Sequence, residues 1–178
     1  MTTYANRGRT FEDYIEYSNR HYESGGDGLI FKQHTHFLPI RDRRGKVVSC
    51  KVDQKAICDY VGIFHGKAVA IEAKETQKGN IRFDAVQPHQ ADFLERFERL
   101  GGKAFVVVSF DFKRFFCIPW NYWYAWYMKH THHISNITAV YDWPVPEKKS
   151  VRIEDLLPEW EVKAVVTGAL DYLASLKG

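Results

Sequence analysis

A strand-like segment interrupted by one short turn signal constrains this fold more than any other feature of the chain. Residues 58–74 read CDYVGIFHGKAVAIEAK, with an apolar stretch on each side of the dipeptide His65-Gly66. Glycine adopts a positive φ freely and histidine tolerates one, so the dipeptide favours a two-residue turn between antiparallel strands. Such a turn pairs Phe64 with Lys67 and thereby fixes which residues share a face along the whole hairpin.

This register gathers three charged side chains on one face. Asp59 lies opposite Glu72, and Lys74 follows two residues later on the same side of its strand. Facing carboxylates repel each other unless a cation cancels their charge, and Mg²⁺ favours one or two carboxylates together with waters and phosphate oxygens. Lys74 would hold or polarise the attacking water. The pattern predicts a metal-dependent phosphodiesterase site, and the alternative is an ordinary surface charge pair.

Two helix residues are candidates to complete this site. Gln90 follows Pro88 at the start of a predicted helix, on the face of Leu94, so its amide is expected to point toward the sheet and orient water or phosphate. Glu12 lies in the first turn of the N-terminal helix and is a candidate third carboxylate ligand. For each, the alternative is an ordinary side chain on a helix surface.

Positive charge is concentrated in residues 32–55. This segment holds seven Lys or Arg residues against Asp42 and Asp53, a net charge of +5, whereas the whole chain carries +3. A local positive field of this kind is typical of a protein that binds a polyanion, although the same side chains could simply solvate an exposed hairpin. The predicted DNA-contacting residues of the segment are Lys32, Arg41, Arg43, Arg44, Lys46, Lys51 and Lys55.

The spacing of apolar residues predicts a mixed α/β domain. A helix is expected from Thr10 to Ser24, a long hairpin at about 34–55 with its turn at Gly45, and a helix that begins at Pro88. Residues 159–176 have apolar positions at steps of three and four, which predicts an amphipathic C-terminal helix. The order of elements indicates one mixed α/β domain over residues 1–178, and the predicted phosphodiesterase site would make it a single nuclease domain.

Composition narrows the class of protein. The chain has 178 residues, of which 45% are hydrophobic, enough for one compact domain with a core. No run reaches the roughly 18 apolar residues of a membrane span, and the N-terminus lacks the apolar centre of a secretory signal. Three cysteines without CxxC spacing fit neither a disulfide framework nor a zinc finger. We therefore expect a cytoplasmic protein with reduced thiols and no membrane partner.

A histidine pattern and an aromatic cluster are weaker candidates for functional sites. The histidines at 34–36 and 130–133 could bind zinc, but no cysteine or third-ligand pattern accompanies them. The aromatic residues of segment 122–127 could stack on bases. Aromatic residues at this density are more often part of a core or of a dimer interface, and we expect that role here.

The motifs together resemble a known family. The segments NRGRTFE (6–12), DYVGIFHGKAVAIEAKET (59–76), PHQADFLERF (88–97) and FVVVSF (105–110) are similar to those of RecU-type Holliday junction resolvases, of the PD-(D/E)xK nuclease superfamily. The resemblance runs from Asn6 to Trp120, and the last helix lies beyond it. It implies a restriction-endonuclease-like fold, with a mixed central sheet flanked by helices and a protruding basic β-hairpin, the stalk.

The resemblance also implies an activity. Members of this family are homodimers that bind four-way DNA junctions and, with Mg²⁺ or Mn²⁺, nick two opposing strands symmetrically. By position, Asp59 and Glu72 match the metal-binding acids, Lys74 the catalytic lysine, Glu12 the first-helix acid and Gln90 the helix glutamine. Segment 34–55 matches the stalk, and the NRG motif, with Arg7 and Arg9, matches an N-terminal DNA-contacting element.

A homodimer also suits the physics of this reaction, because a closed two-fold dimer supplies two equivalent sites at a fixed separation. Two other functions stay open at this point. One is a restriction-like or repair endonuclease that acts on another DNA structure. The other is a DNA-binding protein that bridges strands without cutting them. Recombination proteins are conceivable further partners, and the sequence identifies none.

Overall fold

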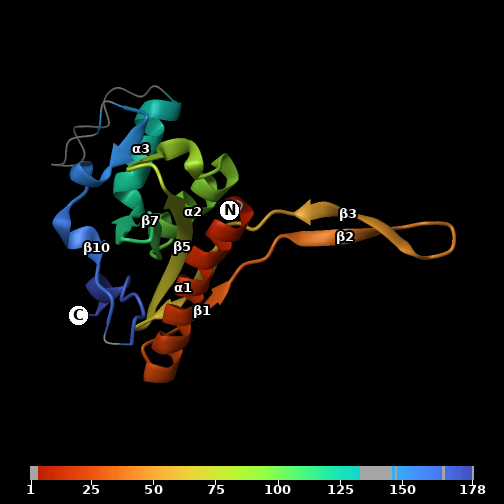
Figure 1. Cartoon of the computed structure of the whole chain (residues 1–178), viewed down its shortest axis with the longest axis horizontal. Helices are drawn as coiled ribbons and strands as arrows, with labels where there is room; N and C mark the ends of the chain where they lie inside the picture. The colour runs from red at the N-terminus through yellow and green to blue at the C-terminus, as the bar shows by residue number, and fades with distance from the viewer. Residues whose placement is uncertain (1–3, 133–145, 147, 166, 178) are drawn as a thin grey trace.

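The computed structural model describes residues 4–132, 146, 148–165 and 167–177, with the backbone alone for residues 4–10. A six-stranded mixed sheet forms its centre, in the order β1-β4-β5-β7-β8-β10 (Figure 1). β5 and β7 are parallel, and the other neighbouring pairs are antiparallel. The strands of this sheet are β1 (Gly28–Lys32), β4 (Tyr60–Phe64), β5 (Lys67–Thr76), β7 (Lys103–Phe110), β8 (Arg114–Pro119) and β10 (Glu161–Val162).

The remaining elements surround this sheet. A small separate sheet pairs β6 (Asn80–Arg82) with β9 (Ser150–Arg152). The helices are α1 (Tyr4–Gly25), α2 (Pro88–Arg99) and α3 (Trp120–Thr131), with 3-10 turns η1 (Phe83–Ala85), η3 (Ile153–Asp155), η4 (Pro158–Trp160) and η5 (Ala174–Leu176). The predicted mixed α/β class, with a central sheet flanked by helices and a protruding hairpin, is confirmed.

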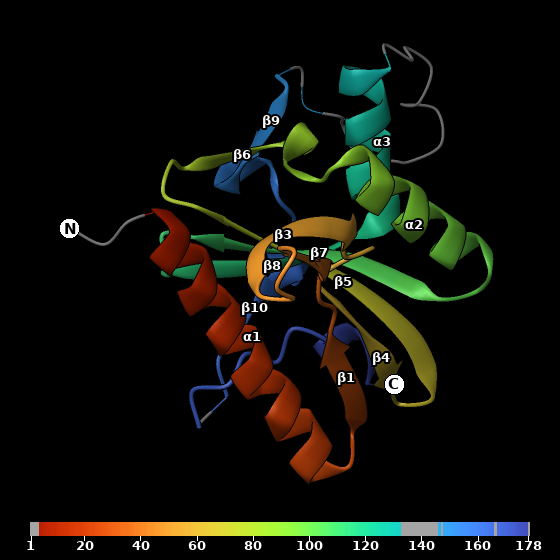
Figure 2. The ribbon, with the colours of Figure 1, turned by 90° about the vertical axis from the view of Figure 1, so that its right-hand side faces the viewer.

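The sheet separates two hydrophobic clusters. Alternate residues of β5 point to opposite sides, so Ile71 packs in the cluster beneath α1 and Ala70 packs in the cluster beneath α2 and α3. Figure 2 shows α1 and α2 on opposite sides of the sheet. Successive side chains along a strand therefore alternate between the α1 face and the α2 face. Two candidate residues can meet only if their side chains lie on the same face.

The turn between β4 and β5 has the predicted register. Phe64 pairs with Lys67, and the two turn residues, His65 and Gly66, have φ values of 46° and 73°. Two positive φ values match a type I′ turn, whose twist suits an antiparallel hairpin. The pairing continues to Tyr60 and Ile71, next to the predicted acidic pair.

The predicted stalk is confirmed as a two-stranded hairpin. β2 (His36–Arg41) and β3 (Val47–Gln54) pair with each other and extend away from the main sheet (Figure 1). Asp42 closes the tip, because its Oδ1 accepts the backbone N–H groups of Arg44 and Lys46 at 2.8 and 2.9 Å. All residues of both strands are exposed. The hairpin is thus free to contact a partner along its whole length.

The aromatic segment of α3 belongs to the core, as expected. Trp120, Trp123 and Trp126 are buried in the cluster on the α2 face. Trp123 and Trp126 pack around the Phe83 ring, with ring centroids 5.7 and 5.6 Å from it. These tryptophans are therefore not available for base stacking.

No described helix is long and apolar enough to cross a membrane.

The predicted C-terminal helix over about 159–176 is wrong. The described part of this segment contains η4, the short strand β10, an isolated bridge between Ala164 and Leu170, and η5. Gly168, with φ +83°, turns the chain back at the point where a helix would have to continue. The apolar residues of this segment are buried as their pattern suggested, but the backbone that buries them is irregular and not helical.

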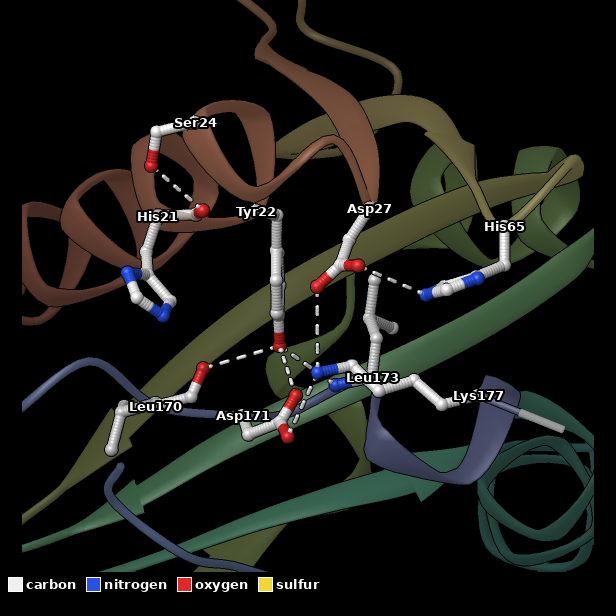
Figure 3. Close-up of polar contacts among 9 residues, drawn as sticks. All are labelled: His21, Tyr22, Ser24, Asp27, His65, Leu170, Asp171, Leu173 and Lys177. Carbon is white, nitrogen blue, oxygen red and sulfur yellow. Dashed lines mark hydrogen bonds and ion pairs between the residues drawn. The ribbon is translucent and has the colours of Figure 1, made fainter. Parts of the chain in front are cut away.

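Side chains of α1 satisfy the backbone of that segment. The Leu170 N–H donates to Ser18 Oγ at 2.8 Å, and the Leu173 N–H donates to the Tyr22 hydroxyl at 3.1 Å. The Tyr22 hydroxyl also lies 3.2 Å from the Leu170 carbonyl and from Asp171 Oδ1 (Figure 3). Because these donors and acceptors are supplied from outside, the segment does not need helical hydrogen bonds of its own.

The first helix is longer than predicted, since it begins at Tyr4 instead of Thr10. The NRG motif therefore lies within α1. The side chains of Arg7 and Arg9, predicted to contact DNA, lie outside the described residues, and so does His133 of the second histidine cluster. α2 begins at Pro88 as expected, with Gln87 and Gln90 forming a reciprocal capping box.

Candidate active site

Asp59, Glu72 and Lys74 lie together where β4 meets β5. Asp59 directly precedes β4, and its backbone N–H donates to the Ile71 carbonyl at 3.2 Å. Its carboxylate turns toward β5, because Oδ2 accepts the Ala73 N–H at 2.7 Å. Glu72 and Lys74 project from β5 on the α2 face. The predicted convergence of the three charged side chains is what the structure shows.

Glu72 is the most unusual group of the site. It is fully buried, and its Oε1 pairs with Lys74 Nζ. Its second oxygen, Oε2, is buried without a hydrogen-bond partner. Burial raises the pKa of Glu72 to about 7, and the neighbouring Asp59 carboxylate adds to the rise although Lys74 opposes it. A buried carboxylate with one unsatisfied oxygen is expensive unless a proton or a cation completes it.

The donors at this site fit a hard divalent cation. The unpartnered Glu72 Oε2 lies beside a second carboxylate, and carboxylate oxygen is the ligand that Mg²⁺ and Mn²⁺ prefer. The described residues contain no group of three or more His, Cys, Asp or Glu side chains arranged to hold a metal ion. The protein ligands gathered here are thus two carboxylates, a number typical of Mg²⁺ sites that also use water and phosphate oxygens.

Glu12 is not brought together with these two acids. Its Oε2 lies 3.0 Å from Lys32 Nζ, and Glu16 Oε1 lies 2.5 Å from the same nitrogen. Lys32 pairs with Tyr60 in the sheet and so points to the α1 face, whereas Glu72 projects from the α2 face. The sheet therefore separates Glu12 from the predicted metal set. Sequence reasoning overlooked Glu16, whose i,i+4 spacing from Glu12 was the available signal.

Gln90 lies on the expected side of the sheet. It is buried at the start of α2, which packs over β5 and β7. Its Oε1 accepts the Gln87 N–H at 2.9 Å, so the carbonyl end serves as a helix cap. The Nε2 end is then the part of this amide that can donate toward the α2 face. Gln90 therefore remains a candidate hydrogen-bond donor in the site, and it also caps the start of α2.

The basic residues of the stalk remain open to a partner. Arg43, Arg44, Lys46, Lys51 and Lys55 are exposed, and exposed Arg41 donates from Nη1 to the Gly45 carbonyl at 2.9 Å. Lys32 differs from these, because Glu12 and Glu16 neutralise it at the base of the stalk. Among the predicted DNA-contacting residues whose side chains are described, those of the hairpin are therefore exposed, whereas Lys32 is held by two carboxylates.

The histidines of the stalk do not form a zinc site within the described residues. His36 Nδ1 instead pairs with Asp53 Oδ2 at 2.9 Å, across the two strands of the hairpin. His130 Nε2 lies 2.7 Å from the Pro146 carbonyl. Both rings thus have structural partners.

Known proteins resemble this chain over most of its length. The family model described as "RecU: Recombination protein U" matches residues 6–178, so the likeness extends through the C-terminal segment that the quoted motifs had left out. A Holliday junction resolvase RecU of Streptococcus pneumoniae (strain Taiwan19F-14) is 34% identical over 114 residues, 61% of this chain and 58% of that protein. The RecU of Streptococcus gordonii is 31% identical over 131 residues, 70% of this chain and 66% of that protein.

Solved structures are similar to the chain as well. The Holliday junction resolvase Hjc of Archaeoglobus fulgidus has a TM-score of 0.39 and 18% sequence identity, and the match covers 65% of this chain and 75% of that chain. The aligned part of this chain spans less than two thirds of the length of the RecU relatives it matches.

Proposed function

Because the chain belongs to the RecU family, whose model spans residues 6–178, we propose that it is a metal-dependent endonuclease that resolves four-way DNA junctions. The observation that carries the proposal is the buried Glu72 carboxylate, with its unpartnered Oε2, beside Asp59 and Lys74. Such a set is costly to maintain in a fold unless a proton or a cation completes the buried carboxylate, and the cation does so when Glu72 is ionised. We choose a four-way junction as the substrate because the RecU relatives are Holliday junction resolvases.

In the proposed reaction each residue has a separate task. Asp59 and Glu72 would hold the cation, and Mg²⁺ or Mn²⁺ would supply Lewis-acid charge to the scissile phosphate. Lys74 Nζ orients the attacking water, whose oxygen bonds to phosphorus as the bond to the leaving strand oxygen breaks. The attacking water gives up a proton to solvent, and the leaving oxygen takes up a proton from solvent. The Gln90 amide donates to a phosphate oxygen or to the attacking water.

The stalk supports the choice of a branched substrate. Its exposed arginines and lysines extend well beyond the sheet, where they can contact several phosphates at once (Figure 1). Phosphate contacts position a protein on DNA and carry little sequence information, so such binding reads shape. We also propose that the protein acts as a homodimer, since two nicks in a two-fold symmetric junction require two equivalent sites.

A cleavage assay with one isosteric variant tests this proposal. Wild-type protein with Mg²⁺ should introduce paired nicks into a labelled four-way junction, and Asp59→Asn should abolish cleavage while it leaves junction binding unchanged. Asp92→Asn is the matched control, because this exposed acid lies on the outer surface of α2 and should cut like wild type.

Other outcomes of this assay separate the alternatives. Equal cutting of linear duplex, flaps and forks would show that the protein is not a junction-selective resolvase. It would instead indicate a nuclease of broader or different specificity. Junction binding without cleavage by the wild type, at any Mg²⁺ or Mn²⁺ concentration, would favour a non-cleaving DNA-binding protein.

A further inference from the structure

The small β6–β9 sheet presents a polar face to solvent. Ile81 pairs with Val151, and both side chains are buried in the cluster beneath α2 and α3. Neighbouring residues of a strand point to opposite sides, so the two flanking pairs face outward. The outward residues are Asn80, Arg82, Ser150 and Arg152. Asn80 Nδ2 donates to Ser150 Oγ at 3.2 Å, which places both side chains on this outer face.

Lysines extend this outer face at both ends. Lys78 comes two residues before the start of β6, and Lys148 and Lys149 directly precede β9. Because β6 and β9 are antiparallel, their starts lie at opposite ends of the small sheet. All three lysines are exposed. The outer face and these lysines together form a surface that we call the basic strip.

The arginines of the basic strip are paired with acids, and its lysines are not. Arg82 Nε donates to Asp84 Oδ1 at 2.8 Å, and Arg152 Nη1 lies 2.8 Å from Glu154 Oε1. No carboxylate of the described residues lies within ion-pair distance of any of the three lysines. The positive charge that is open to a partner is therefore found at the two ends of the strip.

Hydrogen bonds fix the backbone that carries these lysines. Thr76 Oγ1 accepts the Lys78 N–H at 3.1 Å and donates to the Asn80 carbonyl at 2.9 Å. At the other end, the N–H of buried Phe83 donates to the Lys149 carbonyl at 3.3 Å. A partner that binds the strip therefore has to order only lysine side chains, which lowers the entropic cost of binding.

The basic strip begins close to the candidate active site. Lys78 follows Lys74 by four residues, which span at most about 14 Å. Duplex DNA carries one negative charge per roughly 1.7 Å of its axis, so about eight phosphate charges occupy that length. In Figure 2, where the stalk points toward the viewer, the β6–β9 sheet lies above the hairpin, and β1 and β4 lie below it. A duplex with a phosphate at Lys74 therefore has further phosphates within reach of Lys78.

The chemistry of the strip selects the phosphate backbone as its partner. Its described side chains are lysines, arginines, an asparagine and a serine, so it offers phosphate donors and no ring on which a base could stack. Lysine ammonium groups bind phosphate as point charges, without sequence preference. We infer that the basic strip binds the backbone of a duplex arm of the DNA, at a site separate from the stalk. This inference rests on the proposed function for the choice of DNA as the polyanion.

Binding of the full chain to a four-way junction and to a linear duplex, measured by fluorescence anisotropy in metal-free buffer over a series of salt concentrations, tests the inference. Lys148→Gln/Lys149→Gln should weaken binding to both DNAs and lower the dependence of log K on log salt by about 2. Lys78→Gln should lower it by about 1. Lys103→Gln/Lys163→Gln is the matched control with the same loss of charge, because both lysines are exposed outside the strip, and it should behave like wild type. Far-UV circular dichroism establishes that each variant is folded.

The failures of the two proposals are distinguishable. Wild-type salt dependence in either strip variant, or an equal decrease in the control, would overturn the basic strip as a DNA site and leave metal-dependent junction cleavage untouched. A loss of affinity confined to the junction would also overturn it, because a surface for a duplex arm must bind linear duplex as well. The expected decreases, in a protein that binds junctions and cuts none, would support the strip and remove the proposed function.

Discussion

At the scale of single residues, burial of Glu72 makes cation binding depend on pH. The pKa of this carboxyl is raised to about 7 in the metal-free protein, chiefly because burial disfavours its charge. Below pH 7 the carboxyl holds a proton that an incoming cation must displace. Above pH 7 it is already ionised, so the competition disappears.

We therefore expect the apparent affinity for Mn²⁺ to be roughly tenfold weaker at pH 6 than at pH 8, because each pH unit below the pKa reduces the ionised fraction about tenfold. Calorimetric titration at the two pH values measures this difference. The same titration of Asp92→Asn should reproduce the wild-type pH dependence. Affinities that are equal at pH 6 and pH 8 would show that Glu72 is ionised throughout or does not bind the ion.

The sequence was sufficient to predict that Asp59 and Glu72 face each other, but it was insufficient to predict where Glu12 lies. The reason is physical. A two-residue turn at His65 determines the parity of both strands, so the facing of Asp59 and Glu72 follows from local chemistry alone. The position of Glu12 depends instead on which face of the sheet α1 covers. Docking of a helix is a tertiary property, and the spacing of residues within the helix does not encode it.

At the scale of elements, the C-terminal segment depends on α1 for its hydrogen bonds. The buried Tyr22 hydroxyl accepts the Leu173 N–H and contacts Asp171 and the Leu170 carbonyl. Tyr22→Phe should destabilise the fold by about 1–3 kcal/mol, because it leaves buried backbone groups without a partner. Equilibrium urea unfolding measures the loss.

Tyr17→Phe is the control for this substitution. Its hydroxyl donates to the Thr167 carbonyl at 3.3 Å in an exposed setting, where water can replace the bond. The change should cost less than about 0.5 kcal/mol. Equal losses in the two variants would mean that the bonds of Tyr22 do not anchor the segment.

The same element explains why the helix prediction failed there. Apolar residues at steps of three and four suit a helix, but they also suit an irregular chain that turns at Gly168 and buries Leu170, Tyr172 and Leu173 against α1. Periodicity reports which residues are buried and not which backbone buries them. The stalk was predictable because Asp42 and Gly45 build its tip from local contacts.

The stalk is the element on which DNA affinity should depend. Replacing Arg43 and Arg44 by Gln should weaken junction binding and lower the dependence of log K on log salt by about 2, if each arginine contacts one phosphate. Arg96→Gln/Arg99→Gln, a matched pair on the exposed surface of α2, should leave both quantities unchanged. Fluorescence anisotropy over a series of salt concentrations measures them, and identical slopes for the two double variants would remove the stalk from the DNA interface.

At the scale of the whole molecule, one sheet organises all the proposed activities. Its α2 face carries the acidic pair at the centre, and the stalk begins after the end of β1. DNA on the stalk and a cation between Asp59 and Glu72 would therefore be held in one fixed geometry. Hydrolysis depends on the acidic pair, because without a cation the molecule has no means of cutting the DNA.

Titration of Mn²⁺ into wild type, Glu72→Gln and Asp59→Asn by isothermal calorimetry at pH 8 tests that dependence most directly. Wild type should show saturable binding, and each variant should bind at least about tenfold more weakly, as expected when a carboxylate ligand is lost. Variants that bind Mn²⁺ as tightly as wild type would contradict the assignment of this carboxylate pair as the cation site.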